Sequence, residues 1–542
     1  MTDFYWYNPS GSANWTSTGA SGRWYSASGG TGTKFSSVPT STDNAIFDAN
    51  SGAGTCNFPN AAVGNCLNLY CNGYGAVGPT TTQISGGPNS ILNVYGSITL
   101  SPNQVFDLKQ TPKVVMLGSS SATINCNGTS FGDLDIQKTG GQLTLNDDLF
   151  GIGNAVLSLT AGTFIVGTKN VTFGGFYTGG SATRFLAMGS GTWTMTFEGE
   201  SSSIPINTWE VNSSTGLTLD AGTSTIKLLH ARNDPSTNDS QVSALSASLS
   251  DTDTYIYVTD ITPFDVTSGY VWVGEEVIYY SGVNTASRTL IIAGRGIGGT
   301  TILPFVPAYT AVLGAMQGNS ALQVAITAGV PNNISVTDAS KFPKSGVVYI
   351  ENEFISYTGT DLTLNLLTGI SVPANNHSPG VVVYSSQARN FYGGGLTYYN
   401  LVIGCLGYRS ITYIYGSNTF NSIRNKNPGF TYTPTNDAYP GVLTLSFQAA
   451  VTNVVNSFSF TGSSVPSWRQ YICNVVSSSA GVQTTLSIIP PSTTWRVGTN
   501  SVNGGNNTNI SFTGGFTDYL YFQDIIGLPV TATSVGNFFI MF

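Results

Sequence analysis

Charged residues are scarce in this chain of 542 residues: they make up 8% of it, against 41% hydrophobic residues. Low charge combined with high hydrophobicity argues against a disordered chain, which needs the reverse composition. The 19 basic residues form no stripe that could neutralise phosphates, so we expect no binding of nucleic acid. Ser, Thr, Asn and the 64 glycines supply the polar surface instead, which is typical of β-proteins with many turns.

Histidine is scarce as well, and the cysteines lack the spacing of metal ligands. The chain has only His230 and His377, and its six cysteines form no CxxC pair, so the sequence predicts no metal site and no cofactor. No G-x-S-x-G motif is present, and two histidines provide little material for a catalytic triad. Cys66 and Cys71 could pair with Cys56, but we expect free buried thiols, as in a protein assembled in a reducing cytosol.

Long apolar runs are missing too. No run of 18 apolar residues occurs, and the start, MTDFYWYNPSGSANW, has neither a basic region nor an apolar one. We therefore expect no membrane insertion and no signal peptide. The final residues, NFFIMF, resemble the last strand of an outer-membrane barrel, although a strand buried in a subunit contact is the interpretation we favour.

Short alternating segments fill most of the chain, and the clearest run lies at 131–173. Apolar residues alternate there at period two, as in Leu134/Ile136 and Leu143/Leu145, and Gly, Asn, Asp or Thr-Gly pairs separate the segments. Such a pattern fits a meander or the coils of a parallel β-solenoid. Because similar segments return after residue 387, we favour an all-β fold with right-handed parallel β-helix (solenoid) segments.

The first 60 residues are rich in aromatics and contain Trp6, Trp15 and Trp24. These large apolar side chains could close the open end of a solenoid, whose unpaired edge would otherwise recruit another chain. An ordinary small β-domain core is the alternative. The text of this segment, from WYNPSGSANW to DNAIFDANSG, resembles the opening of many phage and bacterial β-helix proteins.

An internal repeat occupies 240–386, between the two solenoid-like regions. The segment SGYVWVGEEVIYYSG, which begins at Ser268, matches SGVVYIENEFISYTG, which begins at Ser345, at an offset of about 77 residues. The second copy, with its Phe342-Pro343 and His377, resembles a small β-module of tailed-phage (cyanophage-like) structural proteins. The first copy lacks the Phe-Pro and the His. Two tandem small modules of β-sandwich or barrel type are therefore expected.

The segments near the C-terminus, SSSAGVQTTL, WRVGTNSVNGGNN and DYLYFQD, resemble a recurrent β-helix ending of phage and bacterial surface proteins. The sequence thus predicts five parts, which are an N-terminal cap (1–60), β-helix block one (61–235), β-module copy one (240–316), β-module copy two (317–386), and β-helix block two with a C-terminal subunit contact (387–542).

The resemblance implies a structural virion protein of a tailed bacteriophage, namely a fibre, spike or capsid-attached appendage that gives rigidity and attaches to the host surface. It further implies a homotrimer that contacts other tail or capsid proteins and a host surface glycan. We expect the chain to be made in the host cytoplasm and to reside in the virion. The alternatives are a tailspike-like polysaccharide depolymerase and a secreted bacterial adhesin.

Paired carboxylates are the candidates for the depolymerase chemistry, because glycoside cleavage needs two carboxyls about 5–10 Å apart. Asp133 and Asp135 alternate on one strand, opposite Leu134 and Ile136, so we expect them on a solvent-exposed face. The other candidate pair is Glu198 and Glu200. We nevertheless expect no enzymatic activity.

The hairpin bends of the two modules also carry carboxylates, among them Glu276 in copy one and Glu353 in copy two. Their repetition indicates a structural contact or ion-binding role rather than catalysis. No calcium-binding loop spacing surrounds them.

Overall fold

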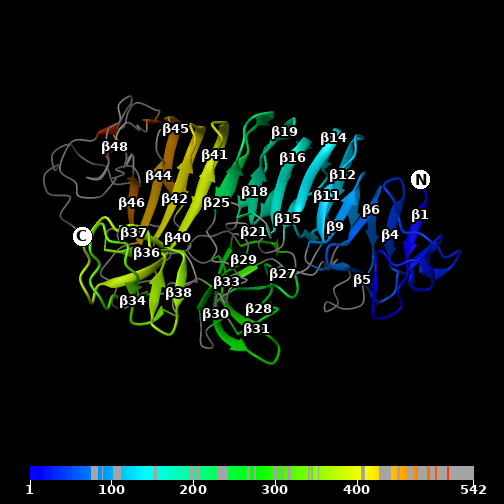
Figure 1. Ribbon diagram of the computed structural model, residues 1–542, viewed down its shortest axis with the longest axis horizontal. Coiled ribbons are helices and arrows are strands. Elements are labelled where there is room, and N and C mark those ends of the chain that lie inside the picture. Colours follow the sequence, from blue (N-terminus) through cyan, green and yellow to red (C-terminus); the bar gives the residue numbers. More distant parts are fainter. Residues whose placement is uncertain are drawn as a thin grey trace.

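The protein is built from β-strands joined by turns (Figure 1). The described elements contain no α-helix, and the two short 3-10 turns among them are η1 (Gly19–Ser21) and η2 (Ser28–Gly30), so the all-β prediction is confirmed. The computed structural model describes residues 1–74, 84–87, 89–101, 112–151, 155–195, 200–201, 204–205, 208–228, 242–262, 264, 269–273, 276–296, 302–306, 311–314, 319–339, 342, 346–351, 353–404, 409–426, 441–447, 452–461, 468–473, 485–488, 495–496 and 510–511.

Most strands pair in parallel with a strand that lies further along the chain, and they do so in three series that together we call the strand stack. The first series contains β1 (Asp3–Trp6), β4 (Asn44–Asp48), β7 (Leu69–Asn72), β10 (Ile98–Leu100), β12 (Ala122–Asn125), the second halves of β14 (Leu134–Leu145) and β16 (Val156–Ile165), β19 (Arg184–Ala187) and β24 (Leu217–Asp220).

The second series uses the first halves of β14 and β16. It contains β6 (Val63–Cys66), β9 (Ile91–Val94), β11 (Lys113–Met116), β14, β16, β18 (Gly175–Thr178), β23 (Trp209–Val211), β40 (Val382–Tyr392), β42 (Arg409–Tyr415), β44 (Gly441–Phe447) and β46 (Trp468–Cys473).

The third series begins later in the chain. It contains β13 (Ser130–Phe131), β15 (Leu149–Gly151), β17 (Val171–Phe173), β20 (Thr192–Met195), β25 (Thr225–Leu228), β41 (Thr397–Gly404), β43 (Thr419–Lys426), β45 (Thr452–Thr461) and β47 (Thr485–Ile488). Shorter pairings join β2 (Ser12–Asn14), β5 (Thr55–Phe58) and β8 (Ile84–Gly86), then β21 (Glu200–Ser201) with β22 (Ile204–Pro205), and β48 (Trp495–Arg496) with β49 (Ile510–Ser511).

Alternation at period two places one set of side chains from each strand in a shared core. β9, for example, buries Leu92 and Val94 and leaves the residues between them half-buried. One continuous cluster of buried residues runs through the stack from Phe4 to Ile423. The expected inward residues of 131–173 belong to it. Burial of this apolar row in each strand holds the layers together.

Two predicted segments of that region form one strand, β14, with a shift of register between Gln137 and Gln142. The strand crosses from the second series to the first at Gly140 and Gly141. Gly141 adopts φ +58°, and a Cβ there would lie 2.5 Å from the backbone of Ser120, so only glycine fits this crossing without displacing the neighbouring layer.

Polar side chains form ladders between layers. The Asn93 amide donates to the Asn65 side-chain oxygen at 3.1 Å. Asn170 donates to both carboxylate oxygens of Asp148, from its backbone at 2.8 Å and its side chain at 3.0 Å. Each ladder joins equivalent positions of adjacent layers, so it satisfies polar groups only when the strands are in register.

The N-terminal strands close one end of the stack, at the right of Figure 1. β1 pairs in parallel with β4 on one side and antiparallel with β3 (Trp24–Tyr25) on the other. Trp6, Trp15 and Trp24 are fully buried, and their rings meet edge to face with centroids 4.9–5.1 Å apart. They belong to the same continuous core as the strands behind them.

Two smaller bodies lie along one side of the stack (Figure 1). We call them module one (residues 242–314) and module two (residues 319–386), and each has its own buried core. Module one contains β26 (Val242–Ala244), β33 (Ala311–Gly314), β29 (Gly269–Val273), β30 (Glu276–Asn284), β31 (Thr289–Gly294) and β28 (Tyr255–Tyr257) in one sheet, with β27 (Leu249–Ser250) paired to β32 (Phe305–Val306). Module two contains β34 (Asn319–Ala321), β36 (Gly346–Ile350), β37 (Glu353–Tyr357), β35 (Ile334–Ser335), β39 (Leu366–Thr368) and β38 (Gly359–Asp361).

The two modules share a turn as well as a hairpin. Asn284 and Asp361 each accept backbone N–H bonds from the residues two and three positions further on. Arg288 and Asn365 then adopt the same left-handed backbone, with φ +52° and +53°. Equal geometry with different side chains indicates that the turn is set by its hydrogen bonds and not by its surface residues.

The modules interrupt the stack without breaking its register. Thr225 of β25 pairs directly with Asn400 of β41, although 175 residues separate them, and the Asn400 amide donates to Thr225 Oγ1 at 3.3 Å. In the neighbouring series β23 pairs with β40. The indole N–H of Trp209 donates to Tyr398 Oη at 3.3 Å across the same junction.

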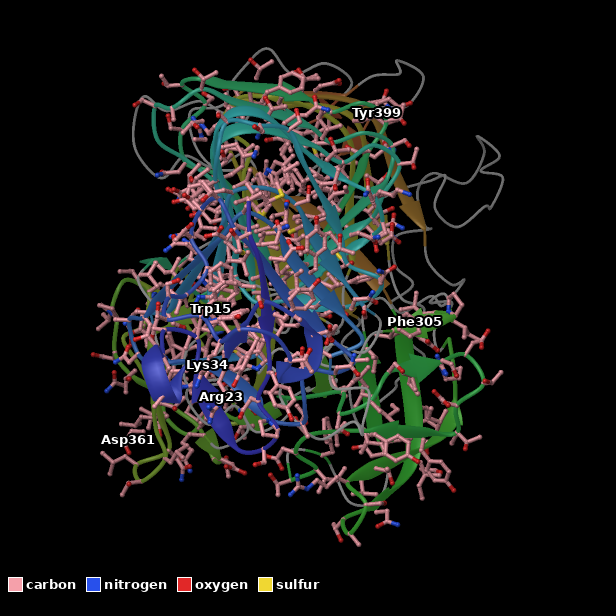
Figure 2. All side chains as sticks on the ribbon, turned by 90° about the vertical axis from the view of Figure 1, so that its right-hand side faces the viewer. Trp15, Arg23, Lys34, Phe305, Asp361 and Tyr399 are labelled. Atoms are coloured by element: carbon pink, nitrogen blue, oxygen red, sulfur yellow. The ribbon has the colours of Figure 1, made fainter. Side chains whose placement is uncertain are left out.

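Strand β40 belongs to module two and to the stack at once. Its first half pairs antiparallel with β34 and β36, and its second half pairs in parallel with β42 and β23. Among the described strands, none of module one pairs with the stack. Phe305 of module one, labelled in Figure 2, provides a contact there instead. A Cβ added to Gly128 would lie 3.2 Å from its ring, so the two residues are neighbours.

Candidate functional site

The carboxylates of Asp133 and Asp135 lie on the outer face of β14, beside β11. Here the expectation of a solvent-exposed face is wrong, because Asp135 is only 3% exposed and Asp133 is partly buried. Their apolar neighbours Leu134 and Ile136 point into the core, as expected. The strand is therefore covered on both faces at this layer, which a pattern of alternating residues does not reveal.

Three neighbouring side chains bind the carboxylate of Asp135. Lys113 Nζ lies 2.9 Å from Oδ2, Thr160 Oγ1 donates to Oδ1 at 2.8 Å, and Gln137 Nε2 donates to Oδ2 at 2.8 Å. Lys113 lies one layer before Asp135, and Thr160 lies on β16, one layer after it. The carboxylate thus links three successive layers.

Asp133 accepts the backbone N–H of Val156 at 2.9 Å, and burial raises the pKa of its carboxyl. A carboxyl of raised pKa beside an ionised one is the arrangement that general acid catalysis of glycoside cleavage requires. A polysaccharide, however, needs access to both groups. The side chain of Asp135 is 4% exposed and already holds three partners, so the pair as folded serves contacts between strands.

Replacement of these two residues by asparagine should separate their roles. Asp133→Asn keeps an acceptor for Val156 and removes a buried charge, so we expect a protein at least as stable as the native one at pH 7. Because burial raises the pKa, the stability conferred by the protonated Asp133 is present below about pH 4 and is lost as the pH rises through the raised value. The gain of the variant should therefore vanish in acid.

Asp135→Asn is the matched variant two residues away. It leaves Lys113 without its counter-ion and weakens the bond to Thr160, so we expect a loss of about 1–3 kcal/mol at pH 7. The thermal unfolding midpoint and the hydrogen exchange of peptides from β11 and β14 would measure both effects. Equal losses in the two variants would contradict the assignment.

The second pair predicted from the sequence is only partly described. Glu198 lies outside the described residues, and Glu200 belongs to β21, where it pairs with Pro205.

In module one the bend carboxylate is a buried ion-pair partner. Glu276 is fully buried and receives two bonds from Arg295, from Nε and from Nη2, each at 2.6 Å. Two backbone N–H groups complete the shell, from Gly296 at 2.9 Å and Leu303 at 3.1 Å. Arg295 also donates to the carbonyl of Ser250 at 2.7 Å. This two-pronged geometry is the strongest form of a carboxylate–guanidinium contact.

In module two the equivalent carboxylate has a histidine as partner. Glu353 accepts the backbone N–H groups of Ala374 and Asn375, the latter at 3.0 Å, and its Oε2 lies 2.8 Å from Nε2 of His377. The other ring nitrogen, Nδ1, lies 2.8 Å from Oε2 of Glu351. His377 is 3% exposed.

The two sites share one design: a buried hairpin carboxylate accepts two backbone N–H groups from a loop and one basic side chain. Sequence reasoning found the carboxylates but missed their partners. Neither Arg295 nor His377 was predicted to bind these carboxylates. The signal that could have found them is their position, since each follows the repeated Glu of its own copy by roughly 20 residues in a loop of otherwise uncharged residues.

A second buried cation, Arg184, lies in the stack. Its guanidinium donates to Thr178 Oγ1 at 2.8 Å and to the carbonyls of Gly180, Ser213 and Thr215 at 2.5–3.1 Å. Burial lowers the pKa of this group. Since the carbonyls that accept these hydrogen bonds belong to turns of two adjacent layers, Arg184 links those turns.

The four described cysteine side chains offer no reactive thiol. Cys56, Cys66, Cys71 and Cys126 are buried and free, which confirms the expectation for them. Burial raises the pKa of each thiol, so each stays protonated at neutral pH. Within the described ranges no three His, Cys, Asp or Glu side chains are grouped as metal ligands, and no helix there is long and apolar enough to cross a bilayer.

Comparison with known proteins gives no assignment: no family model, no curated protein and no solved structure matches this chain.

Proposed function

We propose that the strand stack is a right-handed parallel β-helix and that its two blocks flank the tandem modules. The support is the pairing pattern, in which each strand of a series pairs with the next one in parallel and the three series alternate along the chain. The Asp148–Asn170 contact joins adjacent turns of this helix across 22 residues, and the Asn65–Asn93 contact does so across 28. Both distances in sequence are those of a solenoid repeat.

The proposed function is that of a structural virion protein of a tailed phage, namely a fibre, spike or capsid-attached appendage. One observation carries this proposal: Thr225 and Asn400, which are 175 residues apart in sequence, pair in the stack. The strands before and after the inserted modules therefore form one continuous stack. Such a stack resists bending because each layer is bonded to two others. The modules, which lie to one side, would then be the parts that meet the host surface or other virion proteins.

The proposed homotrimer in the virion would place three copies of the stack around one threefold axis. Light scattering on the purified full chain should give three times the chain mass of 56.9 kDa. Host surface glycans and tail or capsid proteins are the proposed partners.

Labelling of intact phage particles with an antibody against the chain tests the proposed location. We expect label on each particle at a fixed position on the tail or the capsid. Absence of the chain from purified particles by mass spectrometry, together with label on the surface of uninfected bacteria, would favour the secreted adhesin and overturn the proposal.

The depolymerase alternative rests on the raised pKa of Asp133 and on the neighbouring carboxylate of Asp135, which contacts Lys113. We expect no release of reducing sugar from host polysaccharide by the native chain, because both carboxyls are engaged between strands. Release by the native protein that is lost in Asp133→Asn and in Asp135→Asn, with both variants folded, would establish the enzyme instead.

A further inference from the structure

One position in the two modules has the same buried carboxylate and a different basic partner. Glu276 is held by Arg295, which stays charged at every pH that the protein meets. Glu353 is held by His377, and histidine is the side chain whose charge changes near neutral pH. We propose that Glu351, His377 and Glu353 form a proton-dependent latch that closes module two, while module one has a permanent closure at the same place.

The contacts themselves require the proton. Both ring nitrogens of His377 face a carboxylate oxygen at 2.8 Å, and neither oxygen carries a hydrogen when ionised. A neutral ring has one N–H, so one of the two contacts would bring a nitrogen lone pair against an anion. Two good bonds exist only when the cluster holds one additional proton, whether on the ring or shared with a carboxyl.

Among the described residues of module two, two carboxylates contact the ring. They belong to Glu351, on the turn between β36 and β37, and to Glu353, at the start of β37. The segment around Ile326 pairs with His377 through two backbone bonds of 3.0 Å, and it has no charged residue from 321 to 333. The loop of His377 itself has none from 370 to 380 apart from the histidine.

The turn that the latch holds is strained. Glu351 adopts φ +53°, a left-handed conformation that is costly for a glutamate, and its contact with His377 stabilises the turn in this conformation. When the proton leaves, the ring keeps one N–H. Because the Glu353 side chain is 9% exposed and that of Glu351 is 42% exposed, water can replace the donor of Glu351 alone, so Glu351 loses its bond and is repelled by the ring nitrogen. The closed form is therefore stabilised while the cluster holds its additional proton, and this contribution is lost when a rising pH removes that proton.

Opening would free the His377 loop from β37. That loop supplies the two backbone donors of Glu353, from Ala374 and Asn375, so its departure also leaves a buried carboxylate without partners. The consequence is a module whose loop is closed in mildly acidic surroundings and open in alkaline ones. This inference concerns module two alone and holds whether or not the chain is a virion protein.

Hydrogen exchange of the full-length chain, followed by mass spectrometry at about pH 5.5 and about pH 8.5, tests the latch. After correction for intrinsic exchange, we expect peptides from residues 346–357 and 371–381 to lose about tenfold or more of their protection at the higher pH. The matching peptides of module one, 269–282 and 289–296, should change by less than about twofold. Equal behaviour of the two modules would overturn the proposal.

Two variants change whether the cluster needs an additional proton. Glu351→Gln supplies an amide N–H to Nδ1 of a neutral ring, so module two should stay protected at both pH values. His377→Gln cannot be charged, so its protection should be low and independent of pH. If His377→Gln fails to fold, the first variant still decides: a Glu351→Gln protein with the native pH dependence would refute the latch.

Discussion

Replacement of Arg295 by methionine should destabilise module one by about 3–5 kcal/mol, because it leaves the carboxylate of Glu276 buried with backbone donors as its remaining partners. The carboxylate is fully buried, and burial of an uncompensated charge is far costlier than loss of an exposed ion pair. Hydrogen exchange in β29 and β30 should rise to that of a locally unfolded segment while β14 and β16 keep their protection.

Arg288 provides the matched control in the same module. It lies on an exposed turn and donates to the carbonyl of Thr259 at 3.1 Å. Arg288→Asn copies the residue that module two has at this left-handed position, so its effect should stay within about 0.5 kcal/mol. Addition of Glu276→Gln to the Arg295→Met chain should restore part of the loss, since it removes the buried charge and keeps an acceptor. Failure of this rescue would show that methionine disturbs packing and not charge.

Truncation of Trp209 to alanine should cost about 3–5 kcal/mol and should separate the two blocks of the stack. The ring is fully buried and packs against Phe176 at 4.4 Å and against Phe391 and Tyr398 at 6.0 Å between centroids. These partners come from both sides of the inserted modules. The cavity therefore opens at the junction where β23 meets β40, and we expect proteolytic cleavage there before the N-terminal layers unfold.

Tyr399 offers the control for this truncation. It lies on β41 next to the buried Tyr398, but its side chain points outward and is 36% exposed (Figure 2). Tyr399→Ala should shift the unfolding midpoint little, and Trp209→Phe should recover about half of the alanine loss. Equal sensitivity of Trp209→Ala and Tyr399→Ala to protease would mean that the junction does not depend on this core contact.

The inward residues of the strands could be predicted from the sequence because burial of one face leaves a period of two. Leu134, Ile136 and Leu143 illustrate this, since each was expected inside and each is fully buried. The same logic failed for Asp135. Its period assigns it to the outer face, and it does lie there, but exposure depends on what else covers that face, which no local pattern records.

Partners distant in sequence could not be predicted. The contact between Thr225 and Asn400 depends on where the stack resumes after the insertion, and neither residue has a distinctive neighbour. The basic partners of Glu276 and Glu353 were missed for a related reason: one is arginine and the other histidine, so the repeat conceals the equivalence that the folded loops display. Both loops supply a basic side chain to the buried carboxylate, but the residue type differs between the two modules.

Strand β40 gives module two a mechanical role that module one lacks. A pull on module two is applied along β40, where the ladder to β42 must yield in shear, with many hydrogen bonds loaded at once. Among the described strands, those of module one form no hydrogen-bonded ladder with the stack. The contact between Phe305 and Gly128 is a van der Waals contact, which resists force less than such a ladder. We therefore expect tension applied to module two to be transmitted to the strand stack through β40.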